Sequence, residues 1–152
     1  MKKTLYAFAM FLMAVSAFAQ AKISEKDLLG KWQMTSTTMG KSFIDLKNQT
    51  VKIDPEMAKQ AGMNVADMEA VIKEKIAEAD KYLVFTPGMK IEMAIFDGAN
   101  ETYTYTLLER DNNTILGTPN DELKIWFDGP NLRVMVPSDE MDMTATFEKV
   151  VN

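Results

Sequence analysis

The sequence predicts a mainly β protein: an antiparallel, up-and-down barrel of roughly eight strands with a helical insertion after the first strands. Three observations support this fold class. Apolar and polar residues alternate over most of the chain after residue 30, turn motifs separate the alternating stretches, and one large aromatic, Trp32, stands in the first of them. Eight antiparallel strands are about the number at which a sheet closes around a small interior.

Trp32 is the residue around which we expect the barrel to be built. An indole is large enough to plug one end of a small barrel, and Gly30 lets the backbone turn tightly just before it. Residues 24–29 predict one helical turn, capped by Ser24, that covers the same end. The alternative is that Trp32 is an ordinary core aromatic of a β-sandwich.

The first 19 residues have the pattern of a secretory signal peptide. Lys2 and Lys3 precede an apolar stretch over residues 5–18, and Ala17-Phe18-Ala19 supplies small residues at the cleavage positions. Cleavage after Ala21 has the same spacing and is the nearest alternative. The sequence thus predicts a leader over residues 1–19 and one barrel domain over residues 20–152, exported to the periplasm or secreted. Because the chain has no cysteine, we do not expect a lipid anchor, and no other stretch is long enough to span a membrane.

Composition excludes several classes of function. The chain has neither cysteine nor histidine, which argues against a disulfide framework, a thiol or Ser-His nucleophile and the usual zinc site. Its formal net charge of −5 would fall to −7 when the leader and its two lysines are removed, which argues against nucleic acid as a partner. We expect no cofactor.

The segment between the first strand and residue 88 changes pattern. A strand is expected over residues 30–39, and residues 43–46 and 50–53 make either another strand or an interrupted pair. Asp54 and Pro55 then predict a helix that Gly62 ends, and Asn64 caps a second helix. Its apolar stripe runs at helical spacing from Val65 to Leu83, so the insertion covers about residues 55–82. The stripe packs on the barrel or across its mouth, or it contacts a partner.

After residue 88 the chain reads as strands and tight turns. Short spacing between the strands indicates antiparallel neighbours. The six expected strands are 89–96, 101–109, 113–117, 122–127, 131–136 and 141–150.

The triplet Gly30-Lys31-Trp32, just after a leader and a helical turn, resembles the Gly-x-Trp signature of lipocalins. The layout of residues 28–151 is similar to the lipocalin-like domain proteins of Bacteroidota. This calycin-type resemblance implies a basic residue that packs over the tryptophan late in the barrel, for which Lys149 is the better match and Arg133 the second. Gly30, Trp32 and Lys149 would then form the structural plug. The helical insertion departs from the lipocalin order and leaves an open half-barrel as an alternative.

Strand parity predicts which side chains line the barrel. Methionines are numerous, including Met39, Met135, Met141 and Met143, and suit a pliable apolar cavity, although a fully packed core is the alternative. The hydroxyls of Tyr103 and Tyr105 would orient a polar ligand head or reach water. The candidate lining residues are Trp32, Met34, Ile91, Met93, Ile95, Tyr103, Tyr105 and Phe127.

Two groups of polar residues have oxygen ligands suited to Ca²⁺. Both fall where hairpin turns are expected, and neither matches an established calcium loop, so we interpret them as solvated turns and expect no metal site. No acidic residue falls on the predicted inner face, so we do not expect an enzyme. The groups are Asp97, Asn100 and Glu101, and Asp139, Glu140 and Asp142.

Three functions follow as hypotheses. The favoured one is an exported barrel that binds a small apolar molecule in its interior, as the resemblance to lipocalins implies. The alternative is a module that binds or inhibits another envelope protein and has a packed core. An enzyme with a carboxylate site is the third.

Overall fold

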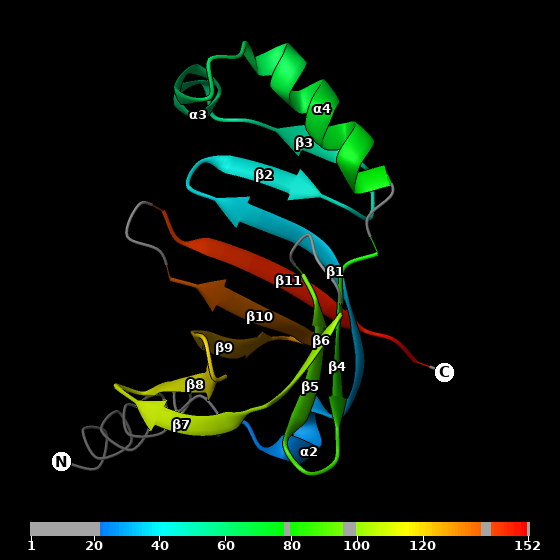
Figure 1. Ribbon diagram of the computed structural model, residues 1–152, viewed down its shortest axis with the longest axis vertical. Helices are drawn as coiled ribbons and strands as arrows, with labels where there is room; N and C mark the ends of the chain where they lie inside the picture. Colours follow the sequence, from blue (N-terminus) through cyan, green and yellow to red (C-terminus); the bar gives the residue numbers. More distant parts are fainter. Residues whose placement is uncertain (1–21, 78–79, 96–99, 138–140, 152) are drawn as a thin grey trace, which may run out of the picture.

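Eleven antiparallel strands form one sheet that curls into a nearly closed barrel, with two helices over one end and a short helix at the other (Figure 1). The computed structural model describes residues 22–77, 80–95, 100–137 and 141–151, so the expected signal peptide lies outside the described residues. The strands are β1 (Gly30–Met39), β2 (Ser42–Asp45), β3 (Thr50–Lys52), β4 (Tyr82–Thr86), β5 (Lys90–Ala94), β6 (Glu101–Thr104), β7 (Thr106–Arg110), β8 (Asn113–Gly117), β9 (Glu122–Asp128), β10 (Asn131–Val136) and β11 (Met143–Lys149). The helices are α2 (Glu25–Leu28), α3 (Pro55–Gln60) and α4 (Val65–Ala77).

The barrel has the up-and-down order. Hydrogen-bonded neighbours follow the path β6-β5-β4-β1-β11-β10-β9-β8-β7, and β2 and β3 branch off β1. The two ends of this path, β6 and β7, are separated in sequence only by Tyr105. The segment 101–110 therefore pairs with β5 through its first half and with β8 through its second, which brings the sheet almost to closure.

The expected count of roughly eight strands is wrong. Residues 42–52 form the interrupted pair of strands that the sequence left open, although the count of eight took them as one. The segment 101–109 is divided at Tyr105. The third addition is β4, which the sequence analysis assigned to the end of the helical stripe. Leu83 fits the helical spacing, but α4 ends at Ala77 and Leu83 lies in β4, opposite Trp32 and Met93. Alternating apolar residues with β-branched and aromatic neighbours make this stretch a strand.

Strand β1 changes neighbours along one edge. Residues 30–33 pair with β4, whereas residues 36–39 pair with β2. The register against β11 shifts between Met34 and Ser36, which is the mark of a bulge. The Thr35 carbonyl accepts backbone bonds from Leu46 at 2.9 Å and Lys47 at 3.3 Å, so the bulge anchors the chain as it leaves β2.

Two hydrophobic clusters result. The barrel core fills the ring, and its largest fully buried side chains include Trp32, Phe85, Tyr105 and Phe147. A separate insertion core lies between the β2–β3 hairpin and the two helices (Figure 1). Only three of its residues are fully buried, Val51, Ile53 and Ala58, and partly buried side chains complete it: Ile44, Met57, Val65, Met68, Ile72 and Ile76.

The helix caps form at the expected residues. Asp54 accepts a bond from the backbone of Glu56 at the start of α3, and Asn64 accepts one from Asp67 at the start of α4. At α2 the expected N-cap, Ser24, forms a capping box with Asp27. The Asp27 carboxylate accepts from both the backbone N–H and the hydroxyl of Ser24, and these bonds hold the pKa of Asp27 below its usual value.

Helix α2 lies at the barrel end opposite the insertion (Figure 1). The indole N–H of Trp32 donates to the carbonyl of Leu28 at 2.6 Å, and Leu28 is itself fully buried. Within the described ranges, none of the helices has the length and apolar character needed to cross a membrane.

Replacing Trp32 by alanine is expected to lower the free energy of unfolding by about 3–5 kcal/mol, because the indole is 2% exposed and joins α2 to the barrel core. Urea denaturation followed by circular dichroism measures the loss. Trp126→Ala, at a partly exposed tryptophan of β9, is the matched control and should cost about 1 kcal/mol or less. A loss below about 1 kcal/mol for Trp32→Ala would show that Trp32 does not plug the barrel.

Candidate functional site

The structure contains a cavity of about 210 Å³ inside the insertion core. The inner face of the β1–β2–β3 sheet forms one wall, and helices α3 and α4 form the other. Its lining is apolar apart from the hydroxyl side chains of Thr37 and Ser42. The full lining is Thr37, Met39, Ser42, Ile44, Ile53, Met57, Met68 and Ile72.

A second cavity, of about 160 Å³, lies where the insertion core meets the barrel core. Met34, Leu46 and Ile95 belong to the barrel side, and Ile44 and Ile76 belong to the insertion side. Its full lining is Met34, Thr37, Ile44, Leu46, Ile76, Lys81, Ile95 and Met143.

The two cavities adjoin, and we call them together the inner compartment. They share Thr37 and Ile44, which are cross-strand partners on neighbouring strands and so present their side chains to the same face of the sheet. Their combined volume lies in the lower part of the range of about 300–1,000 Å³ that small-molecule sites occupy. Of the chain's 13 methionines, five line this compartment: Met34, Met39, Met57, Met68 and Met143.

Hydrogen bonds fix the helices over the hairpin. The buried hydroxyl of Ser42 accepts from the backbone of Asp54 at 2.9 Å and donates to the Met57 sulfur at 3.5 Å, which joins β2 to α3. The Ile53 backbone N–H donates to the Glu69 carboxylate at 3.3 Å, which joins the end of β3 to α4. These bonds hold helices α3 and α4 against the hairpin that forms the other wall of the compartment.

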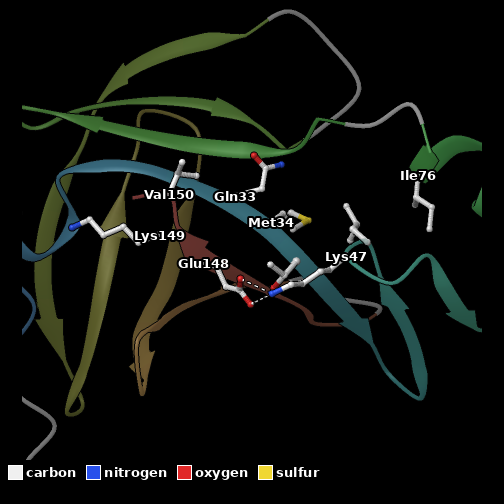
Figure 2. Close-up of a pocket in the computed structure, with 9 residues that line it drawn as sticks. Gln33, Met34, Lys47, Ile76, Glu148, Lys149 and Val150 are labelled. Carbon is white, nitrogen blue, oxygen red and sulfur yellow. Dashed lines mark hydrogen bonds and ion pairs between the residues drawn. The ribbon is translucent and has the colours of Figure 1, made fainter. Parts of the chain in front are cut away.

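A third cavity, of about 400 Å³, adjoins the inner compartment and opens outward at the bulge of β1 (Figure 2). We call it the outer cavity. It shares Met34, Leu46 and Ile76 with the inner compartment, and the rest of its lining is largely polar: Gln33, Thr35, Lys47, Glu148, Lys149 and Val150.

The predicted cavity-lining residues all face the barrel core, but only two line the inner compartment. Met34 and Ile95 do so. Trp32, Ile91 and Tyr105 are buried in the barrel core. The remaining three, Met93, Tyr103 and Phe127, are partly buried against that core. Phe127 also lines a separate cavity of about 120 Å³.

The residues expected to form the plug lie together. The Lys149 ammonium lies 5.2 Å from the centroid of the Trp32 ring. The centroids of the Trp32 and Phe127 rings lie 5.8 Å apart. Gly30 has a φ of +114°, and a side chain there would meet the Lys149 stem at 3.4 Å. Arg133, the second candidate, instead bonds Thr146 and Asp128.

Tyr105 carries an unusual buried hydroxyl. The residue is 1% exposed, its ring packs edge-on against Phe85 at 5.4 Å, and within the described part of the chain its hydroxyl has no hydrogen-bond partner. Burial, with a smaller contribution from Glu25, raises the pKa of Tyr105 above its usual value. The phenol therefore stays protonated and acts as an unused donor in the barrel core.

The sequence analysis missed the residues that the insertion contributes. Ile44, Ile53, Ile72 and Ile76 line the inner compartment, and so do Met57 and Met68, which were not among the methionines singled out. The available signal was the apolar stripe of the second helix, which needed a surface to pack against. Parity alone could not show that the hairpin of residues 42–52 would supply that surface.

The groups considered for calcium give no metal site in the part of the chain that is described. Asp97, Asp139 and Glu140 lie outside the described residues. Among residues 22–77, 80–95, 100–137 and 141–151, no three or more His, Cys, Asp or Glu side chains are placed to hold a metal ion together.

Replacing Tyr105 by phenylalanine is expected to leave the free energy of unfolding unchanged or to raise it by up to about 1 kcal/mol, because the change removes a buried hydroxyl without a partner. Urea denaturation measures it. Tyr82→Phe is the control and should lower stability, since the Tyr82 hydroxyl donates to Glu92 at 2.8 Å and accepts from Asn100 at 2.6 Å. If Tyr105→Phe lowers stability by more than about 1 kcal/mol, the hydroxyl has a partner.

No protein-family model matches this sequence. No curated protein matches it either. Among solved structures, the chain is similar to the crystal structure of Echinococcus granulosus fatty-acid-binding protein 1, with 13% sequence identity and a TM-score of 0.42 over 83% of this chain and 99% of that one.

Proposed function

We propose that this protein is an exported carrier that binds a small apolar molecule in the inner compartment, and that it is not an enzyme. The observation that carries the proposal is the pair of adjoining cavities, whose lining is apolar except for Thr37, Ser42 and Lys81. Export is supported by the leader pattern of residues 1–19 alone.

The side chains of the inner compartment suit an adaptable apolar site. Methionine is unbranched and flexible, so five methionines can adjust to ligands of different shape at small cost. The polar groups that face the cavity of about 210 Å³ are a threonine and the Ser42 hydroxyl, which is already bonded to Asp54 and Met57. Desolvation of apolar surface is therefore the main source of affinity that this cavity offers.

The packing of α4 also favours a site at this position. None of its residues is fully buried, although Met68, Ile72 and Ile76 turn toward the hairpin. An apolar ligand between the helix and the sheet would bury these side chains further and so stabilise the folded insertion.

An uncharged fluorescent probe, N-phenyl-1-naphthylamine, tests the proposal. We expect the wild-type protein to bind it with enhanced fluorescence, and Ile72→Lys to weaken binding at least about tenfold, because an ammonium at the cavity wall is poorly solvated. Val71→Lys is the matched control. Val71 is the next residue of α4 and is 43% exposed, so this change should leave binding intact.

Two further measurements make the result decisive. Circular dichroism of Ile72→Lys checks that the variant is folded, and Ile72→Met, which keeps an apolar side chain, should retain binding. Equal binding by wild type, Ile72→Lys and Val71→Lys would place the probe elsewhere and contradict the proposed site. No binding by the wild type would remove the support for a carrier.

A further inference from the structure

We infer that the ligand is an uncharged amphiphile: its apolar part lies in the inner compartment and its polar, hydrogen-bonding head lies in the outer cavity against Lys47 and Glu148. This inference rests on the proposed function, because it names the class of molecule that the same site would take.

The first step is continuity. The outer cavity and the cavity of about 160 Å³ share three lining residues, Met34, Leu46 and Ile76. That cavity in turn shares Thr37 and Ile44 with the innermost one. The three cavities therefore lie in a row from the space under α4 to the outer cavity, and we infer that one elongated molecule spans them.

The second step is the position of the opening. One edge of β1 bonds to β4 as far as Gln33, where the Met34 N–H donates to the Lys81 carbonyl at 2.8 Å, and the same edge bonds to β2 from Ser36 onward. The bulge lies between these two pairings. The sheet is thus divided beside Met34 and Thr35, and the outer cavity takes its lining from both faces of the sheet at this division.

The third step is the chemistry of the outer cavity. The Lys47 ammonium binds both carboxylate oxygens of Glu148, at 3.0 and 2.9 Å (Figure 2). The Lys149 side chain points away from this pair, because its ammonium lies over the Trp32 ring (Figure 2). The Gln33 amide nitrogen is bonded to Asp80 and to the Lys81 carbonyl. The two charges that face the cavity therefore balance one another.

A balanced ion pair favours a head without net charge. A carboxylate on the ligand would compete with Glu148 for Lys47, so that one of the two anions loses its partner. A cationic head would compete with Lys47 for Glu148 in the same way. Because the pair is about half exposed, solvent offsets part of either loss. A hydroxyl or an amide both donates and accepts, so it can bond to the pair without separating it. The net charge of −5 adds a general repulsion against anions.

Three molecules that share an octyl chain and differ only in the head test the inference: octan-1-ol, nonanoate and octylammonium. Each is titrated at pH 7 against the protein loaded with N-phenyl-1-naphthylamine, and the concentration that displaces half of the probe is measured. We expect octan-1-ol to displace the probe at the lowest concentration. Lys47→Met should shift the preference about threefold toward octylammonium, and Glu148→Gln should shift it about threefold toward nonanoate.

A second ion pair provides matched controls. Arg110 and Glu122 form a similarly exposed pair at 2.7 Å, with side-chain exposures of 56% and 52% against 60% and 45% for Lys47 and Glu148. Neither residue lines the inner compartment or the outer cavity. Arg110→Met and Glu122→Gln change the net charge by the same amounts and should leave the order of the three molecules unchanged.

The outcomes separate the two proposals. Opposite shifts in the Lys47→Met and Glu148→Gln variants support the head position. If the probe binds and Ile72→Lys removes it, but the three molecules compete equally in every variant or wild type prefers nonanoate, the inferred head position is wrong while the carrier proposal stands. If the wild type does not bind the probe, the carrier proposal itself fails.

Discussion

The structure depends on one constraint: a strand edge can bond to only one neighbour at each position, and β1 has to serve two. Its first residues pair with β4 and complete the barrel, while its last residues pair with β2 and begin the insertion. The bulge between Met34 and Ser36 makes this change possible, because it uncouples the two halves of the strand. The barrel core, the insertion core and the cavities between them all follow from this division.

Features set by neighbouring residues were predictable from the sequence. Strands β8 and β10 have the expected bounds, the caps at Asp54 and Asn64 form, and all eight candidate lining residues face the barrel core. Each of these depends on alternation, a turn or a cap within a few residues. Strand β4 was missed because Leu83 satisfies two periods at once, and only its pairing with β1 and β5 decides between them.

The position of the cavity was not predictable in the same way. Parity shows which face a side chain occupies but not whether its neighbours fill the space in front of it. In the ring, Trp32, Phe85 and Phe147 come from three different strands, Tyr105 lies between two others, and all four side chains are fully buried. In the insertion, the fully buried residues are only Val51, Ile53 and Ala58, and the helices pack against them through partly buried, flexible side chains such as Met57 and Met68. The looser cluster is therefore the one that leaves room.

Because of this contrast in packing, the two ends of the molecule differ in how much buried surface would be exposed if they opened. At the α2 end, the Trp32 indole is held by the Leu28 carbonyl and the Lys149 ammonium, so opening that end would expose the largest buried side chain of the fold. At the other end, α4 buries no residue completely, and separating it from the hairpin exposes less apolar surface. Local opening has the lower cost where less surface is buried. The end of the fold that opens at lower cost is therefore the insertion, beside which the outer cavity lies where β1 changes neighbours.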